Sequence, residues 1–290
     1  MCELDDLSEF AKRRSGLTRR RFGLMTVGAG LAAAVPRLVG AADVQGRDVE
    51  IETPAGTADA YFVHPTSGKH PGVLMWPDIF GLRPAFRQMA SRLAESGYAV
   101  LVVNPFYRTQ PAPTAPENPD FGDPATRDAL MALKATLDAD TTAVDAKAFV
   151  GFLDQQPATD TKKKIGTQGY CMSGPMVIQT AASVPGRIGA GASFHGGGLV
   201  TDGPDSPHLL IPKTQAQFLI AIAADDDAKD PAAKETLRAA FAKADVPAEI
   251  EVYAGTRHGW CPPDSPVYDH DQAEKAWSRL LALFARALAG

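Results

Sequence analysis

The chain has few cysteines, no long apolar run and no marked excess of charge of either sign. Its 290 residues include three cysteines, which are too few for a disulfide framework. The formal net charge of −5 argues against a nucleic-acid-binding surface, which is normally strongly basic. Hydrophobic residues make up 45% and charged residues 22%, values that are ordinary for a globular protein and untypical of a disordered one.

Sequence motifs of several function classes are missing as well. The chain contains no G-x-G-x-x-G motif and no phosphate-binding P-loop. It also contains no H-x-x-x-H or C-x-x-C pair, the spacings found in many zinc and redox sites. We therefore expect no metal and no catalytic cofactor.

The first 42 residues differ in kind from the rest. Thr18-Arg19-Arg20-Arg21 precedes an uncharged run from Phe22 to Pro36, and small residues follow at Gly40-Ala41-Ala42. A basic region, an apolar stretch and a small-residue cleavage site are typical of a secretory signal. At about 15 residues, the run is shorter than the roughly 20 needed to span a bilayer.

The paired arginines make this segment similar to a twin-arginine (Tat) signal peptide. We expect residues 1–42 to be that signal, recognised by the twin-arginine translocase and then removed. The mature protein would be periplasmic or secreted, with no stable membrane insertion. The alternatives are an N-terminal anchor helix or a basic amphipathic helix.

Residues 43–290 alternate short apolar strands with amphipathic helices, and residues 108–125, rich in Pro, Asp, Asn and Thr, predict a loop or lid. Strands are expected at 47–53, 57–63, 71–76, 98–103, 164–168, 189–194, 217–223 and 248–253. Helices are expected at 84–96, 126–138, 140–155, 173–184, 231–244 and 271–289. This alternation predicts a single α/β domain, with a mostly parallel central sheet and helices on both faces.

A turn between an expected strand and an expected helix has the pattern of a nucleophile elbow. It reads Gly169-Tyr170-Cys171-Met172-Ser173-Gly174, close to G-x-S-x-G. The residues two before and two after the nucleophile must be small, and Gly169 and Ser173 meet that demand. Cys171 occupies the nucleophile position; the alternative is a cysteine that is simply packed in the turn.

An acid and a histidine follow in the chain order of this kind of site. Asp225-Asp226-Asp227 comes at the end of an expected strand, and His258 lies in the loop after the last one. Any of the three aspartates can orient the histidine, the others being a solvated acidic turn. His195 follows another strand and opens a Gly-Gly-Gly turn; a structural role is favoured over a place in the pocket.

These residues resemble the dienelactone hydrolase family, a branch of the α/β-hydrolase fold, over roughly residues 45–289. The likeness rests on Trp76-Pro77-Asp78-Ile79-Phe80-Gly81, on Gly169-Tyr170-Cys171, on the three aspartates and on Arg257-His258-Gly259. It implies an α/β-hydrolase fold and a carboxymethylenebutenolidase-like hydrolase of small lactones or activated esters. A Cys-His-Asp triad would act through a thioester intermediate.

The resemblance also implies a role for individual residues. Cys171 would be the nucleophile, His258 the general base and Asp226 the triad acid, with Asp227 as the alternative. The backbone N–H groups of Ile79 and Met172 would form the oxyanion hole.

Further family positions concern substrate binding and thiol activation. Arg108 is similar to the family's arginine that meets a substrate carboxylate, which would favour an anionic substrate. Asp78 stands where members that hydrolyse dienelactone carry a glutamate that helps take the thiol proton. Asp78, and Ser173 in place of the usual glycine, weaken the inference to dienelactone more than the inference to ester or lactone hydrolysis.

Three alternatives remain open at the level of the sequence. The protein could be a general carboxylesterase, or a catalytically silent binding protein with the same fold. Cys261 lies three residues after His258, so a Cys171–Cys261 disulfide could act as a redox switch. Packing of Cys261 beside Trp260 is the favoured interpretation.

Overall fold

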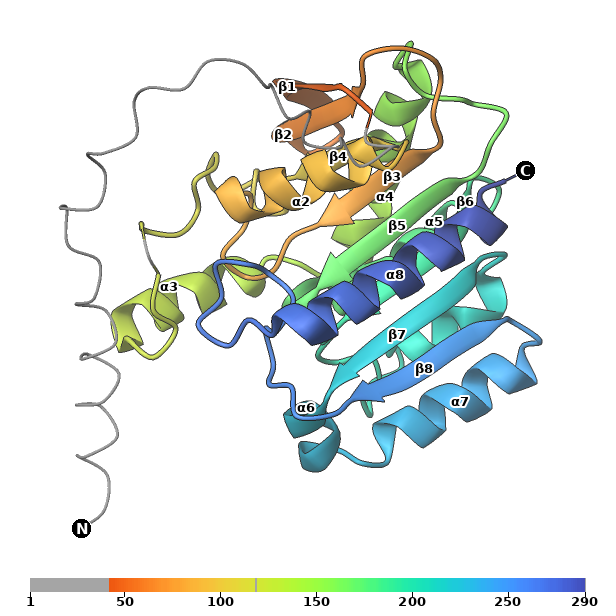
Figure 1. The fold of residues 1–290 in the computed structure, drawn as a ribbon. Helices are drawn as coiled ribbons and strands as arrows, with labels where there is room; N and C mark the ends of the chain where they lie inside the picture. The colour runs from red at the N-terminus through yellow and green to blue at the C-terminus, as the bar shows by residue number, and fades with distance from the viewer. Residues whose placement is uncertain (1–41, 118, 290) are drawn as a thin grey trace, which may run out of the picture. The chain divides into compact units, whose positions relative to one another are not determined.

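The computed structural model describes residues 42–117 and 119–289, which contain one sheet of eight strands in the order β1-β2-β4-β3-β5-β6-β7-β8 (Figure 1). The strands are β1 (Val44–Thr53), β2 (Gly56–Pro65), β3 (Gly72–Trp76), β4 (Ala99–Val103), β5 (Ile165–Tyr170), β6 (Ile188–Phe194), β7 (Gln217–Ala223) and β8 (Ala248–Tyr253). β2 pairs antiparallel with β1 and with β4, and every other neighbouring pair is parallel.

The central strands are buried along their whole length. Every residue of β3, β4, β5 and β6 is inaccessible to solvent, as expected for parallel strands covered on both faces. β1, at one edge of the sheet, instead alternates buried Val49 and Ile51 with exposed charged residues. β8 forms the opposite edge.

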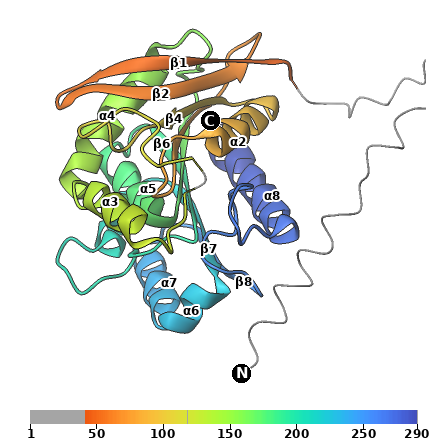
Figure 2. The same ribbon diagram turned by 90° about the vertical axis from the view of Figure 1, so that its left-hand side faces the viewer.

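Helices cover both faces of the sheet. α2 (Pro84–Glu95) and α8 (His270–Ala287) lie on one face, and α4 (Ala139–Gln155), α5 (Gly174–Ser183) and α7 (Ala233–Lys243) lie on the other (Figure 2). Each face has its own core, one containing Phe149 and Phe218 and the other Phe86 and Phe284. This is the α/β-hydrolase fold, as the sequence predicts.

All eight expected strands and all six expected helices are present, with ends shifted by a few residues. α3 (Pro124–Lys134) starts and stops earlier than expected because Asp123 caps it and Pro124 occupies its first turn. The 3₁₀ helix η2 (Pro207–Lys213) and the short helix α6 (Ala224–Lys229) are not expected from the sequence, and the turn expected at Cys171 contains a single 3₁₀ turn. Both η2 and α6 are too short to show a helical period of apolar residues.

The loop expected at residues 108–125 has no regular secondary structure in its described part before α3 begins. No helix in the described ranges combines the length and the apolar composition needed to cross a bilayer. The expected signal peptide and its cleavage site lie almost wholly outside the described residues.

Candidate active site

Cys171 lies where β5 ends, in a tight 3₁₀ turn, η1 (Cys171–Ser173), that leads into α5. Its φ of 54° is in the left-handed region, which costs free energy for a residue with a side chain. Gly169 is required here, since a Cβ at this position would lie 2.3 Å from the carbonyl oxygen of Ser173. The Ser173 hydroxyl donates to the carbonyl of Pro77 at 2.5 Å, tying the turn to the end of β3.

His258 connects the cysteine to an acid. Its Nε2 lies 3.0 Å from the Sγ of Cys171, and its Nδ1 lies 2.6 Å from the Oδ2 of Asp226. A carboxylate only accepts hydrogen bonds, so Nδ1 carries the proton and Nε2 faces the thiol. This is the order of contacts that activates a nucleophile through a base held by an acid.

The surroundings of His258 favour its protonated form. Burial disfavours the imidazolium, but the hydrogen bonds with Asp226 and Cys171 outweigh burial and raise the pKa of His258 to about 10. Burial likewise opposes the charge of Asp226, but contacts with His258 and Lys229 leave its pKa below the usual value. A proton transferred from Cys171 to the imidazole of His258 is therefore stabilised there by the Asp226 carboxylate.

The three aspartates make different contacts from the first turn of α6. Asp225 accepts the backbone N–H of His258 at 2.8 Å, Asp226 meets the ring, and Asp227 pairs with Lys234 at 2.7 Å. Asp226 thus contacts the imidazole. Asp227, which the sequence leaves as the alternative triad acid, pairs with Lys234 instead.

Ile79 and Met172 lie together in a small apolar cluster beside Cys171. Its buried members are Ile79, Phe106, Leu130, Leu133 and Met172, and partly buried Phe80, Ala115, Leu137 and Cys171 pack against them. Among the hydrogen bonds of the described residues, none uses the backbone N–H of Ile79 or Met172. Both N–H groups therefore have no hydrogen-bond acceptor among the described residues.

Asp78 has its own set of partners. Both of its oxygens accept from the Arg83 guanidinium, at 2.6 and 2.9 Å, and one also accepts the N–H of Phe80. Burial raises the pKa of Asp78, although Arg83 lowers it in part. Arg83 also forms two hydrogen bonds to Asp264, so it links the loop after β3 to the loop after His258. No described hydrogen bond joins Asp78 to Cys171.

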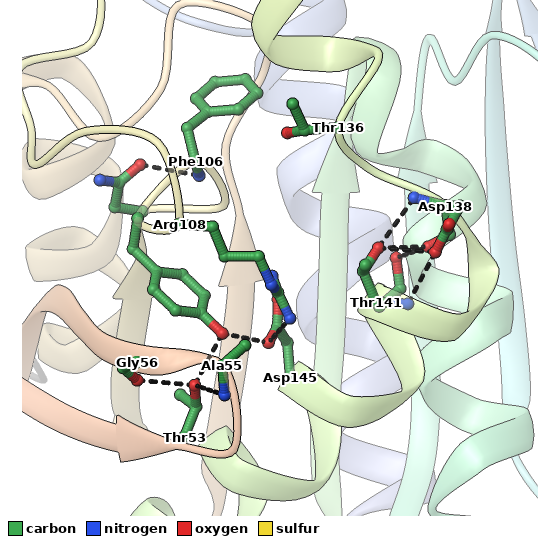
Figure 3. A network of polar contacts seen from close by, with 12 residues as sticks. Thr53, Ala55, Gly56, Phe106, Arg108, Thr136, Asp138, Thr141 and Asp145 are labelled. Atoms are coloured by element: carbon green, nitrogen blue, oxygen red, sulfur yellow. Dashed lines mark hydrogen bonds and ion pairs between the residues drawn. The ribbon is translucent and has the colours of Figure 1, made fainter.

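Arg108 is also engaged elsewhere. Its guanidinium donates to both oxygens of buried Asp145 on α4, at 2.7 and 2.8 Å, and Tyr107 donates its hydroxyl proton to the same carboxylate (Figure 3). The side chain runs toward Asp145 and the β1–β2 turn at Thr53, away from the Phe106 ring (Figure 3). The structure does not bring Arg108 to Cys171 by any described contact.

His195 belongs to the site, although the sequence favours a structural role for it. Its Nδ1 accepts the backbone N–H of Cys171 at 3.2 Å, and its ring centroid lies 5.2 Å from that of His258. Burial, together with His258, lowers the pKa of His195 to about 3, so the ring is neutral. Its place after a strand and before three glycines is the only sequence signal.

Cys171 and Cys261 are both free thiols in the described part of the chain. Cys261 is buried, and it lines a cavity of about 130 Å³ between α2 and α8 together with Tyr170 and Trp277.

No cluster of three or more His, Cys, Asp or Glu side chains in residues 42–117 and 119–289 could hold a metal ion.

The chain is similar to known proteins over most of its length. The profile described as "Dienelactone hydrolase family" matches residues 58–288. A carboxymethylenebutenolidase from Rhodococcus opacus is 27% identical over 240 residues, which are 80% of this chain and 88% of that protein.

Two solved structures share the fold at lower sequence identity. A dienelactone hydrolase-like promiscuous phosphotriesterase from metagenomic libraries has a TM-score of 0.70 and 22% identity, covering 86% of this chain and all of the other. A dienelactone hydrolase from Anabaena variabilis has a TM-score of 0.60 and 16% identity, covering 84% of this chain and 99% of the other.

Proposed function

Because the chain belongs to the dienelactone hydrolase family, we propose that this hydrolase cleaves a lactone or an activated carboxylic ester through Cys171, His258 and Asp226. The observation that carries the proposal is the continuous contact from the Sγ of Cys171 through the imidazole of His258 to Asp226, at 3.0 and 2.6 Å. The strained φ of Cys171, at 54°, is a second support, because it exposes the nucleophile at the tip of a sharp turn.

In the acylation step, Nε2 of His258 holds the proton of the Cys171 thiol, and the sulfur attacks the carbonyl carbon. The carbonyl oxygen becomes an oxyanion, held by the backbone N–H groups of Ile79 and Met172. One such donor contributes a rate factor on the order of 100 or more. The C–O bond then breaks, the leaving oxygen receives the proton from His258, and the acyl group remains on sulfur as a thioester.

In the deacylation step, His258 takes a proton from water, and the resulting hydroxide attacks the thioester carbon. The C–S bond breaks, and the proton returns to the sulfur of Cys171. Asp226 keeps the imidazole in the tautomer that both steps need. No cofactor enters this scheme.

The test is hydrolysis of a dienelactone and of p-nitrophenyl acetate by wild-type protein and Cys171→Ala, with and without reductant. We expect the variant to lose at least about 1,000-fold in kcat for every substrate that the wild type turns over, as expected when a nucleophile is removed. Full esterase activity in Cys171→Ala would falsify the mechanism. Absence of turnover by the wild type would favour the catalytically silent binding protein.

One observation favours a general carboxylesterase as the second candidate. Asp78 is held by two hydrogen bonds from Arg83, so it is not free to take the thiol proton as the family's glutamate does on dienelactone. Turnover of p-nitrophenyl acetate without turnover of the dienelactone would support this candidate. It would leave the Cys171 mechanism in place.

Export of the protein is a separate proposal, supported by the sequence of residues 1–42 alone. We expect replacement of Arg19, Arg20 and Arg21 by lysine to block processing and retain the full-length chain in the cytoplasm. Fractionation followed by mass determination of the mature N-terminus tests this. Unchanged export of the variant would rule out a twin-arginine route.

A further inference from the structure

We propose that the ester taken by this enzyme has an uncharged, apolar acyl chain rather than an anionic one, an inference that rests on the function proposed above. Two observations carry it. Apolar side chains pack against one side of Cys171, and Arg83 and Arg108 are already paired with carboxylates. The proposal departs from the anionic substrate that the sequence resemblance implies for Arg108.

The first observation is the apolar cluster at Cys171. Its buried side chains come from the loops after β3 and β4, from α3 and from the turn that carries Cys171. An acyl group bonded to the sulfur, with its oxygen at Ile79 and Met172, extends along these side chains. Sites of this kind bind through apolar contact, with a few polar groups fixing orientation.

An aromatic pair extends this apolar surface toward solvent. Phe80 packs against the cluster, and its ring meets that of Phe121 edge-on at a centroid distance of 6.4 Å. Phe121 is 40% exposed, so part of this aromatic pair is accessible to a bound ligand. The Phe80–Phe121 pair thus forms an apolar rim beside the nucleophile.

The second observation is the state of Arg108. The guanidinium forms two hydrogen bonds to Asp145, whose side chain is 2% exposed, and the Tyr107 hydroxyl donates to the same carboxylate (Figure 3). Turning Arg108 toward a substrate carboxylate would leave Asp145 as an unpaired buried charge, which is strongly unfavourable. The Arg108–Asp145 pair therefore offers no free positive charge to an anion.

Three other cations of the loops around His258 and Asp78 are also paired with carboxylates. Arg83 pairs with both Asp78 and Asp264, and Lys229 lies within 4 Å of both Asp225 and Asp226. Lys234 pairs with Asp227, while Arg257, next to His258, is exposed to solvent. Three of these four cations are therefore already paired with carboxylates.

The experiment compares p-nitrophenyl hexanoate with mono-p-nitrophenyl adipate, which share a leaving group and a chain length and differ in one terminal carboxylate. Rates in Cys171→Ala are subtracted as background. We expect kcat/KM of the wild type to be at least about tenfold higher for the hexanoate, since the anion must be desolvated against an apolar surface. A rate for the adipate that equals or exceeds that for the hexanoate overturns the proposal.

A matched pair of variants locates the effect. Phe121→Lys places a positive charge at the apolar rim, and we expect the hexanoate-to-adipate ratio to fall by about threefold or more. Leu209→Lys adds the same charge at a 51% exposed apolar residue on η2, an element that packs on α5 and α7, and should leave the ratio unchanged. Equal shifts in both variants overturn the proposed place of the acyl chain.

The same assay separates this inference from the function on which it rests. Failure of the wild type to turn over either ester overturns the proposed function, and the inference with it. Turnover that depends on Cys171 but favours the adipate overturns the inference alone.

Discussion

The aspartates at 225, 226 and 227 are identical in type and adjacent in sequence, yet each contacts a different partner. Asp225 accepts a backbone N–H, Asp226 accepts from an imidazole and Asp227 pairs with a lysine. They project in different directions because they occupy successive positions in the first turn of a helix. Substitution of each in turn therefore separates three roles with one chemical change.

Asp226→Asn preserves shape but removes the carboxylate that holds the Nδ1–H of His258. The amide can present its NH₂ to Nδ1 and so select the wrong tautomer, and we expect kcat to fall by about 1,000- to 10,000-fold. Steady-state kinetics on an activated ester measure this. A loss below tenfold in Asp226→Asn would remove this residue from the triad.

Asp227→Asn is the matched control, and we expect it to keep kcat within about twofold, because its ion pair with Lys234 does not contact the imidazole. Asp225→Asn should lie between the two, since it weakens the anchor of the histidine backbone alone. If Asp227→Asn lowered kcat more than the other two substitutions, Asp227 rather than Asp226 would be the triad acid.

His195 supports a prediction about the nucleophile's backbone. Asparagine can place an acceptor close to the position of Nδ1, and it tolerates the positive φ of 41° at this residue. We expect His195→Ala to lower kcat about tenfold or more and His195→Asn to recover most of it, because the bond to the N–H of Cys171 holds the elbow.

The pH dependence of kcat distinguishes positioning by His195 from proton transfer. Since its pKa is lowered to about 3, His195 stays neutral across the working range, and both variants should keep the wild-type pH profile. A displaced acidic limb in His195→Asn would show that His195 exchanges protons with the substrate.

Chain order and strand ends single out Cys171, His258 and the three aspartates in the sequence, and the structure brings Cys171, His258 and Asp226 into contact. The sequence leaves Asp226 and Asp227 as alternatives, since choosing between them requires the direction of side chains in α6. It favours a structural role for His195, because the acceptor of a backbone N–H 24 residues away has no pattern in the sequence.

At the scale of elements, Arg83 joins two loops that carry different parts of the site. It lies at the start of α2, bonds to Asp78 in the loop of Ile79, and bonds to Asp264 in the loop that follows His258. Its guanidinium also lies over the rings of Phe80 and Phe86. The loop that carries Asp78 and Ile79 is thereby tied to the loop that follows His258.

Asp264→Asn should lower kcat by roughly fivefold to twentyfold with a smaller change in KM, because small misplacement of reacting groups slows the chemical step. Glu274→Gln is the matched control. It weakens the ion pair between Arg92 of α2 and Glu274 of α8, which touches neither loop. Equal effects on kcat in the two variants would indicate general loosening of α2 against the C-terminal part of the chain.

Elements are predictable here where apolar periodicity is long enough to measure. The buried strands and the amphipathic helices are found within a few residues of their observed ends. α6 is missed because a six-residue acidic helix buries no residue and so has no apolar face. That helix carries Asp226, which contacts the imidazole of His258, so the missed element matters for the proposed function more than its size suggests.

At the scale of the whole molecule, the His258–Asp226 pair makes folding stability depend on pH. His258, with its folded pKa raised to about 10, contributes stability that is complete below its unfolded pKa of about 6.5 and is lost as pH rises through about 10. Asp226, with a lowered pKa, contributes stability above about pH 4 that is lost at lower pH. The two contributions coincide between about pH 4 and 6.5.

Urea unfolding of wild type and His258→Gln at pH 6, 8 and 10.5 measures the effect. We expect the difference in unfolding free energy to be largest at pH 6 and to shrink at each step upward. A difference that grows with pH would mean that the imidazole is neutral in the folded protein.

The overall architecture can be predicted from the sequence, but the order of the strands in the sheet cannot. Alternating strands and helices predict a mostly parallel sheet covered on both faces, which the structure has. The placement of β4 between β2 and β3 depends on crossovers between distant segments, and no local pattern encodes it.

The two edge strands of that sheet, β1 and β8, affect whether molecules aggregate in concentrated solution. The outer strand β1 presents Arg47, Asp48, Glu50 and Glu52, and β8 presents Glu249 and Glu251, which pair with Arg279 and Lys275 of α8. Charged side chains along an outer strand oppose its pairing with a strand of another molecule. The edge strands of this sheet therefore oppose the addition of strands from other molecules, and with it the growth of fibres.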